Sequence, residues 1–264
     1  MSERIILIET STALCSAAIM EDGEIVSSRE SDAMRSHASL TALFVDEMLK
    51  ERGLALKDCS AVCVSLGPGS YTGLRVGVST AKGLCFGSGL PLLAVGTLDI
   101  LAAQALDDAS ISGDCDYIIP MIDARRMEVY TAIYDREGKR LSEVEARIIN
   151  SESFSELQGR KLFIGDGALK CEPVLQGDNR FVQSCPKAVG MKKIGPAGVP
   201  RGRFKGGCLF GAFLPQGVRG YGQQEENHLR SLSSRLRSWL TSSILTSRSS
   251  PLLMMKVIGT RSTL

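Results

Sequence analysis

The segment Ser65–Leu84, SLGPGSYTGLRVGVSTAKGL, contains residue types that can bind an anion. An apolar run enters a glycine-rich turn, Gly67–Gly73, and a helical pattern follows it. Because backbone N–H groups are free at the start of a helix, such a turn can bind a phosphate group. The spacing fits neither GxxxxGK[ST] nor GxGxxG, however, and a tight turn with unusual backbone angles explains the glycines equally well.

The helix predicted after this turn contains a row of small residues. Gly73, Gly77 and Ala81 are four residues apart and therefore lie on one helix face. Glycine inside a helix costs about 0.5–1 kcal/mol relative to alanine, so a compensating close contact is expected. Side-chain size at a contact sets the distance between helix axes. The row therefore predicts close approach of a second helix, either from this chain or from a partner.

Composition excludes several classes of protein. The chain has 264 residues, of which 44% are hydrophobic and 23% charged, as in soluble globular proteins. No apolar run approaches the roughly 18–20 residues of a membrane span, and the N-terminus lacks a signal-peptide pattern. The eight cysteines form no CxxC pair, and the two histidines, His37 and His228, are far from any cysteine cluster. We therefore expect a cytoplasmic protein with reduced cysteines, no metal and no cofactor.

Apolar patterns predict alternating strands and helices in two units. The elements expected in the first unit, residues 1–106, are strands at Ile5–Glu9, Cys15–Met20, Glu24–Ser28, Ala61–Leu66 and Pro91–Val95 and helices at 37–52, 74–86 and 98–106. The strands expected in the smaller second unit, residues 107–190, are Tyr117–Asp123, Glu128–Tyr134 and Leu162–Gly167. This order predicts an α/β fold in which helices cover mixed sheets.

Several motifs, in this order, resemble those of the TsaB (YeaZ) family. The longest is GPGSYTGLRVGVSTAKGL. The others are Ile8–Thr12 (with Glu9 where the family usually has Asp), Ser36–Ala38, DARRMEVY at Asp123–Tyr130 and GDGA at Gly165–Ala168. The match extends from residue 1 to about residue 190. The resemblance implies an actin/Hsp70/sugar-kinase (ASKHA, Gcp-like) fold with two lobes of related topology.

The resemblance also implies a role in tRNA modification. TsaB-like proteins are non-catalytic subunits that dimerise with and activate TsaD, working together with TsaE. TsaD is the ligase that transfers a threonylcarbamoyl group to the adenosine next to the anticodon. We therefore expect a TsaD-type ligase and a TsaE-type ATPase as partners, contact with tRNA only through the complex, and a homodimer when the chain is alone.

Residues that related enzymes need are missing from this sequence. TsaD-like chemistry uses a metal held by two histidines four apart on a helix, and no histidine occurs between residues 38 and 227. ATP-hydrolysing relatives have a DxGxT hairpin, whereas Glu9–Thr12 contains no glycine. We therefore assign no catalytic residue and interpret Glu9 as a structural carboxylate and His37 as a helix-start residue. A stand-alone Gcp-like glycoprotease or an ASKHA ATPase is the alternative.

The expected function is therefore protein interaction. The helices at 37–52 and 71–86 are predicted to pack against the equivalent pair of TsaD in a four-helix contact. The small-residue row is expected to permit close approach, so that a leucine at Gly77 leaves a folded protein that no longer binds TsaD. The predicted interface residues are Leu40, Phe44, Met48, Tyr71, Gly73, Leu74, Gly77 and Ala81.

The segment 191–264 differs in character from the rest of the chain. It contains 12 Lys/Arg and 2 Asp/Glu, which leaves 19 and 27 in residues 1–190. Such asymmetry can indicate a nucleic-acid-binding tail. A one-base shift of the reading frame inside Lys193, however, permits RLARQAFREGDLREVACL followed by EPFYLKEF, which resembles the family's C-terminal motif. We therefore expect a base gained or lost near Met191–Lys193, read-through after about residue 226, and a poorly ordered tail without function.

Overall fold

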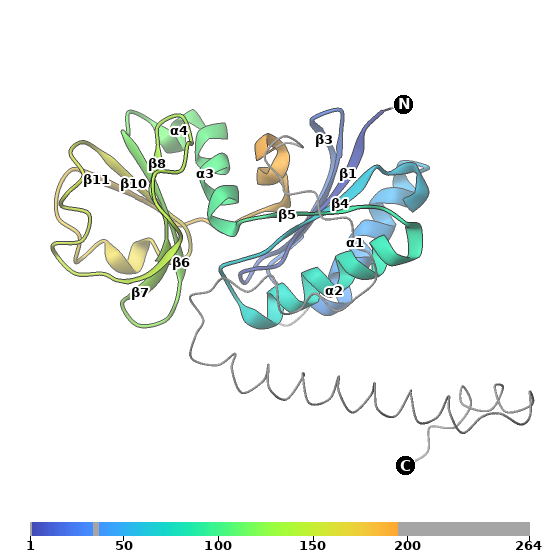
Figure 1. The fold of residues 1–264 in the computed structure, drawn as a ribbon, viewed down its shortest axis with the longest axis horizontal. Helices are drawn as coiled ribbons and strands as arrows, with labels where there is room; N and C mark the ends of the chain where they lie inside the picture. The colour runs from blue at the N-terminus through green and yellow to red at the C-terminus, as the bar shows by residue number, and fades with distance from the viewer. Residues whose placement is uncertain (1, 34–36, 195–264) are drawn as a thin grey trace, which may run out of the picture. The chain divides into compact units, whose positions relative to one another are not determined.

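Two mixed β-sheets organise the part of the chain that the structure describes (Figure 1). The structure is a computed structural model, and it describes residues 2–33 and 37–194. These residues belong to one compact unit. The expected α/β fold, with helices covering mixed sheets, is confirmed. Of the predicted tail, 191–264, the structure describes only residues 191–194, which end a short 3-10 helix in which Met191 is buried against the first sheet; the rest lies outside the described residues.

The first sheet has the strand order β3-β2-β1-β4-β5. β1 pairs antiparallel with β2 and parallel with β4, β2 pairs antiparallel with β3, and β4 pairs parallel with β5. β1 is central because both of its faces are apolar and buried. The strands are β1 (Arg4–Glu9), β2 (Cys15–Glu21), β3 (Glu24–Ser31), β4 (Ala61–Ser65) and β5 (Leu92–Val95).

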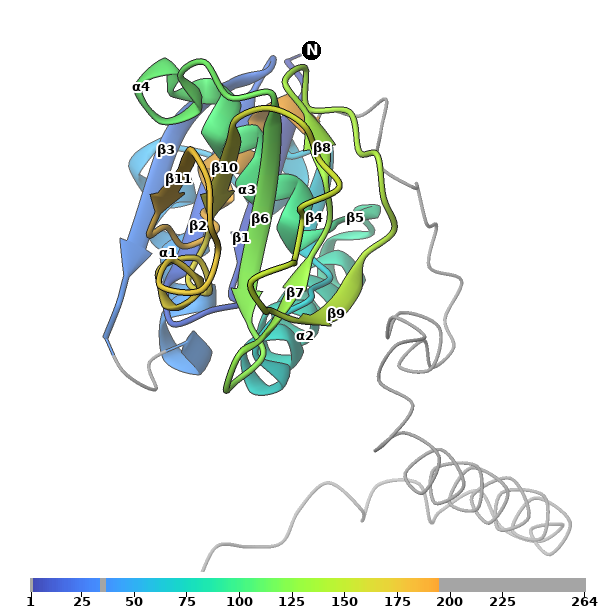
Figure 2. The same cartoon turned by 90° about the vertical axis from the view of Figure 1, so that its left-hand side faces the viewer.

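Helices α1 (His37–Glu51) and α2 (Tyr71–Ser88) cover one face of this sheet (Figures 1 and 2). They lie side by side, and the core beneath them includes Ile6, Ile8 and Met48. Because side chains alternate along a strand, the intervening residues of β1 face the opposite core, which the chain's later segments cover.

Capping residues explain the ends of α2. The helix begins at Tyr71 instead of the predicted Leu74, because Ser70 Oγ accepts a hydrogen bond from the Gly73 amide at 3.3 Å. It ends at Ser88, and Gly89 follows in the left-handed conformation that commonly terminates a helix. The glycine-rich turn therefore leads directly into the helix.

The second sheet repeats the strand order of the first. Read from its other edge, its main path is β9-β7-β6-β10-β11, which corresponds to β3-β2-β1-β4-β5. The parallel and antiparallel pairings correspond as well. Two lobes of related topology are what the resemblance to the actin/Hsp70/sugar-kinase fold implies. The strands are β6 (Tyr117–Asp123), β7 (Glu128–Thr131), β8 (Tyr134–Asp135), β9 (Glu145–Ile148), β10 (Lys161–Ile164) and β11 (Asn179–Val182).

Sequence patterns missed the edge strands β9 and β11. Both are short and largely exposed or half-buried, so they lack the apolar pattern of an interior strand. The single strand predicted at Glu128–Tyr134 is divided into β7 and β8, which pair with opposite ends of β6.

Helix α3 (Thr97–Asp107) contributes side chains to the cores of both sheets. Ile100 packs with the first sheet, whereas Leu101 packs with the second. The hydroxyl of Tyr134 in β8 also donates a 2.7 Å hydrogen bond to Asp99. The boundary expected between the first two units falls beside this shared helix, and the division into units at 106 and 190 stays a prediction.

After β11 the chain returns to the first sheet. The amide of Ala188 donates a 2.9 Å hydrogen bond to Ser16 Oγ in β2. Lys187 Nζ forms an ion pair of 3.0 Å with Glu30 of β3. The remaining short elements are α4 (Ala109–Ser112) and the 3-10 helices η1 (Leu56–Asp58), η2 (Leu169–Cys171) and η3 (Ala188–Ile194).

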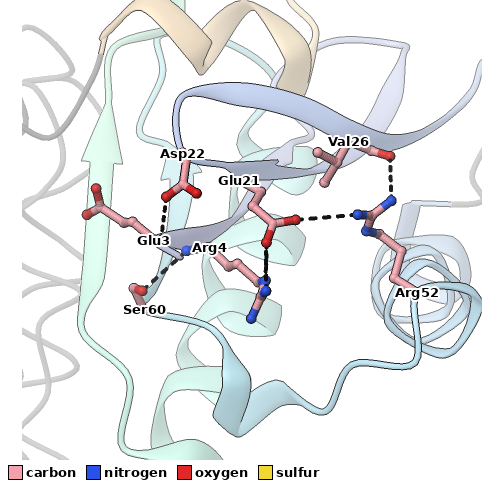
Figure 3. Close-up of polar contacts among 7 residues, drawn as sticks. All are labelled: Glu3, Arg4, Glu21, Asp22, Val26, Arg52 and Ser60. Atoms are coloured by element: carbon pink, nitrogen blue, oxygen red, sulfur yellow. Dashed lines mark hydrogen bonds and ion pairs between the residues drawn. The ribbon is translucent and has the colours of Figure 1, made fainter. Parts of the chain in front are cut away.

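A polar network joins the end of α1 to one end of the first sheet (Figure 3). Arg4 Nε donates a 2.8 Å hydrogen bond to Glu21, and a nitrogen of Arg52 lies 3.4 Å from the same carboxylate. The hydrogen bond from Arg4 lowers the pKa of Glu21. Because Arg4 begins β1 and Glu21 ends β2, this network fixes the strand ends remote from the β1–β2 turn.

Three negative findings apply to the described residues alone. No helix there is both long and apolar enough to cross a membrane. The cysteines of this part of the chain are free thiols. No group of three or more metal-ligating side chains occurs among residues 2–33 and 37–194.

Candidate functional site

The β1–β2 turn fills the space in front of the glycine-rich turn Gly67–Gly73. The Ser70 amide donates a 2.6 Å hydrogen bond to the carbonyl of Ser11. A Cβ added to Gly69 would lie 2.4 Å from that carbonyl oxygen. The Gly73 amide is also engaged, by the Ser70 hydroxyl. Of the two interpretations of these glycines, the geometry supports the tight turn, because the chain itself occupies amides that a phosphate would need.

Glu9 ends β1, and its side chain is completely buried. It accepts a 2.5 Å hydrogen bond from the Ser11 amide. Burial raises the pKa of Glu9 to about 7, although the nearby hydroxyls of Ser11 and Ser65 oppose the shift. Its Oε2 has no well-formed hydrogen bond to a described residue. A fully buried carboxylate cannot touch a substrate in solution, so the geometry supports the structural interpretation of Glu9.

The small-residue row of α2 faces the chain's own core. Gly73, Gly77 and Ala81 are all buried within this chain. A Cβ on Gly73 would lie 2.0 Å from the Thr10 carbonyl oxygen, and one on Gly77 would lie 2.3 Å from Thr10 Oγ1. The close contact expected from this row therefore exists, but it is made by the β1–β2 turn. This corrects the expectation that these residues permit a partner helix to approach and that Gly77→Leu leaves a folded protein.

The other predicted interface residues differ in exposure. Tyr71 is 52% exposed, and the guanidinium of Arg75 lies over its ring at 5.3 Å. Phe44 and Met48 are buried in the core under α1 and cannot contact a partner directly. The remaining two, Leu40 and Leu74, are half-buried.

A second row of small residues, which was not predicted from the sequence, lies on the outward side of α2. Ser79 is exposed, and a Cβ added to Gly83 or Gly87 would meet no atom of the described part of the chain within 4 Å. These three residues are also four apart. Phe86 beside them is 93% exposed, and Leu43 of α1 is 44% exposed. We call Ser79, Gly83, Phe86 and Gly87 the outward face of α2.

The outward face was visible in the sequence only as spacing. Gly83 and Gly87 continue the helical pattern at the same interval as Gly73 and Gly77. Spacing places each row on one side of the helix, but it does not state which side meets the sheet. In the folded chain, the contact with Thr10 shows that the row of Gly73 and Gly77 is the one that faces the sheet.

The β6–β7 turn occupies the same place in the second sheet as the β1–β2 turn in the first. Asp123 ends β6, as Glu9 ends β1. Asp123 accepts hydrogen bonds from Lys170 Nζ and, at 2.9 Å, from the Arg125 amide. Burial opposes its ionisation, yet these hydrogen bonds hold the pKa of Asp123 below its usual range. The two equivalent carboxylates therefore differ, because one is buried without a cation and the other is paired with lysine.

Cys185 lies between β11 and η3 and is half-buried. Burial raises the pKa of its thiol, while the Thr12 hydroxyl opposes the shift and the charge of Asp166 adds to it. Asp166 in turn accepts a 2.9 Å hydrogen bond from the Asp123 amide. His37, at the start of α1, lies with Nε2 3.0 Å from the Thr12 carbonyl oxygen, which agrees with its interpretation as a helix-start residue. Hydrogen bonds thus hold the β6–β7 turn through Asp166, and a separate contact joins the β1–β2 turn to α1 through His37.

Comparisons with known proteins match this fold and these motifs. The family model of TsaD, tRNA N6-adenosine threonylcarbamoyltransferase, matches residues 24–173. The tRNA threonylcarbamoyladenosine biosynthesis protein TsaB of Escherichia coli is 34% identical over 170 residues, which cover 62% of this chain and 71% of that protein. TsaB of Bacillus subtilis is 33% identical over 141 residues, covering 53% and 58% of the two chains.

A solved structure agrees with the sequence comparisons. YeaZ from Pseudomonas aeruginosa superposes with a TM-score of 0.62 and 26% sequence identity. The superposition covers 72% of this chain and 88% of that one. The similarity therefore includes most of the YeaZ chain and not a single motif.

Proposed function

Because this chain belongs to the TsaB family of tRNA threonylcarbamoyladenosine biosynthesis proteins, we propose that it is the non-catalytic subunit of a threonylcarbamoyl-transferring complex. In this proposal it dimerises with a TsaD-type ligase and, together with a TsaE-type ATPase, activates transfer to the adenosine next to the anticodon. A cytoplasmic location and contact with tRNA only within the complex belong to the same proposal.

The observation that supports this proposal best is the outward face of α2. Glycine in a helix interior costs about 1 kcal/mol relative to alanine. Gly73 and Gly77 are required by the contact with Thr10, but no atom of the described residues comes near a side chain at Gly83 or Gly87. A partner that approaches the helix closely would explain these two glycines, and the exposed ring of Phe86 would be buried in the same contact.

The partner's fold supports the same arrangement. The TsaD family model matches residues 24–173 of this chain, a range that includes both α1 and α2. A TsaD-type ligase should therefore present an equivalent pair of helices, and two similar pairs can pack as a four-helix contact. The same face would pair with a second copy of this chain when the ligase is absent.

The geometry at the β1–β2 turn supports the non-catalytic part of the proposal. Amides of the glycine-rich turn are bound to Ser11 and Ser70, and Glu9 is closed off from solvent. The groups that would have to hold a nucleotide phosphate or a substrate are therefore used for folding. A stand-alone glycoprotease or ATPase would need these groups to be accessible.

The test uses purified full-length chain with a TsaD-type ligase, a TsaE-type ATPase and tRNA. We expect threonylcarbamoylation to require this chain and Gly83→Leu to abolish both co-purification with the ligase and activation. Leucine at position 83 points into open space, so the variant should fold. Ala109→Leu is the matched control, because it adds the same side chain to an exposed position of α4.

Two results would contradict the proposal. Modification at full rate without this chain would remove its role as a required subunit. Normal binding of the ligase by a folded Gly83→Leu variant would show that the outward face of α2 is not the contact. Glycoprotease or ATPase activity of the chain alone would favour the alternative functions.

A further inference from the structure

The β6–β7 turn has an unusual backbone. Arg125 and Arg126 have φ values of +74° and +48°, and they are consecutive. Residues with a side chain rarely adopt this left-handed region, and glycine or asparagine would adopt it with less strain. Strained residues of this kind persist where the surrounding structure holds them, and they are concentrated at functional sites. The need for a turn therefore does not explain why two arginines occur here.

Hydrogen bonds from the surrounding chain hold the turn in place. Asp123 binds the Arg125 amide, and the Glu128 amide donates to the Arg125 carbonyl at 3.1 Å. Lys170 Nζ donates both to Asp123 and, at 2.7 Å, to the Glu128 carbonyl. The Asp166 carboxylate fixes the Asp123 amide from the other side. Every group in this scaffold acts on the backbone of the turn.

The two guanidinium groups take no part in this scaffold. Both arginine side chains are exposed, and neither forms a hydrogen bond or ion pair with a described residue. Arg125 helps to lower the pKa of Asp123, but Lys170 is the group that binds that carboxylate directly. The turn therefore presents two positive charges to solvent from a backbone that is already fixed.

A phosphate group is the ligand that suits these charges. Guanidinium binds phosphate with two parallel hydrogen bonds, and arginine is the preferred residue for phosphate recognition. Residues 1–190 contain 19 basic and 27 acidic residues, so this part of the chain repels RNA in general. A phosphate contact on it must therefore be local, and the arginine pair is a local exception to the negative charge.

The position of the turn suits a nucleic acid held by the complex. It occupies the same place in the second sheet as the β1–β2 turn in the first, and His37 at the start of α1 lies 3.0 Å from the Thr12 carbonyl oxygen of that β1–β2 turn. α1 belongs to the helix pair that the proposed function assigns to the ligase. An RNA bound by the ligase would thus have this turn within the same assembly, and phosphate contacts are those that position a nucleic acid without reading its sequence.

We propose that Arg125 and Arg126 form a contact for the phosphate backbone of the tRNA bound by the complex. This inference rests on the proposed function and adds a direct tRNA contact to it. It makes one part of that proposal specific, since the tRNA within the complex then touches this chain as well as the ligase.

The test compares tRNA binding by the complex of the ligase with three versions of the full chain. They are the unchanged chain, Arg125→Asn/Arg126→Asn, and the control Arg136→Asn. Asparagine tolerates the left-handed region, so the double variant removes the charges and keeps the turn. Arg136 is a 72% exposed arginine that follows β8 and pairs only weakly, at 3.7 Å, with Glu137. Because all versions have the same basic tail, differences between them report the substituted residues.

We expect the double variant to bind tRNA about tenfold more weakly at ~0.1 M salt. The slope of log affinity against log salt concentration should fall by about one to two units. The Arg136 variant should behave like the unchanged chain. Co-purification with the ligase is measured in parallel and should be the same for all three.

The possible failures are distinguishable. If the ligase is bound normally and tRNA affinity and salt slope are unchanged, the phosphate contact is overturned and the proposed function stands. If the double variant loses the ligase but not tRNA, the arginines bind protein, which also overturns the inference. If the unchanged chain does not bind the ligase at all, the proposed function itself fails.

Discussion

The hydroxyl of Thr10 donates a 2.8 Å hydrogen bond to the carbonyl of Gly73, and the same side chain occupies the space beside Gly77. The β1–β2 turn and the start of α2 are therefore packed together without a gap. This contact explains why Gly73 and Gly77, on the inward side of α2, are glycines. It also fills the space through which a phosphate would otherwise approach the glycine-rich turn.

Gly77→Ala should destabilise the fold. A Cβ at position 77 would lie 2.3 Å from Thr10 Oγ1, so either the helix or the turn must move. Overpacking of this kind costs about 1–3 kcal/mol of the free energy of unfolding, which urea denaturation measures. Adding Thr10→Ala should restore part of the loss, because it removes the obstructing hydroxyl.

Gly83→Ala is the matched control for this measurement. It places the same methyl group in open space on the same helix, so it should raise the free energy of unfolding by about 0.5–1 kcal/mol. Equal effects of the two alanine substitutions would contradict the assignment of an inward and an outward row.

Glu9→Gln should change how stability depends on pH. The pKa of Glu9 is about 7 in the folded chain against 4.5 for an unperturbed glutamate, so the folded state binds the proton more tightly. The stabilisation from the neutral carboxyl is fully present below pH 4.5 and is lost as pH rises toward 7. Glutamine stays neutral and can still accept from the Ser11 amide.

The comparison needs unfolding curves for both proteins at several pH values. Above pH 7 the glutamine variant should be more stable, by up to about 3 kcal/mol, and the difference should shrink toward pH 4.5. Other carboxylates titrate in both proteins, so the difference between them isolates Glu9. A difference that does not vary with pH would show that Glu9 is ionised in the folded state or has an ordinary pKa.

The interior of the fold could be predicted from the sequence because its signals are local. β1 and β4 are continuous apolar runs, and the Asp22-Gly23 pair marks the turn that joins β2 and β3. The edge strands have no such runs, because pairing with a neighbour and not burial forms them. Their existence depends on the rest of the sheet.

The candidate site was harder to predict because it depends on contacts between distant residues. Two glycine rows with the same spacing occur in α2, and only the position of Thr10 shows which of them faces inward. The left-handed backbone at Arg125 and Arg126 also has no local signal, since arginine is not a residue typical of that conformation. The Asp123 and Lys170 side chains that hold this turn come from separate parts of the chain.

Resequencing of the gene should reveal one base gained or lost near the codons of Met191–Lys193. The shifted frame permits RLARQAFREGDLREVACL followed by EPFYLKEF, and a family-like ending is not expected from an arbitrary frame. The second base of each codon is nearly determined by the amino acid, which limits what a shifted frame can encode. An intact open frame as printed across codons 190–230 would refute this prediction, and residues from 195 onward lie outside those that the structure describes.

Phe86→Ser should weaken binding to the TsaD-type ligase without weakening the fold. The ring is 93% exposed, so its removal costs little native packing, and the free energy of unfolding should change by less than about 0.5 kcal/mol. An aromatic ring buried at the centre of an interface commonly contributes about 2 kcal/mol, which corresponds to a roughly thirtyfold change in affinity. Calorimetric titration of the ligase measures this change.

Ile148→Ser provides the matched control for Phe86. It also replaces an exposed apolar side chain by serine, with 72% of Ile148 exposed, but it lies on the edge strand β9 of the second sheet. If the outward face of α2 is the contact, only the Phe86 variant loses affinity. If the two variants lose affinity equally, exposed apolar area in general drives the association, and α2 has no special part in it. A loss confined to Ile148→Ser would move the contact to the second sheet.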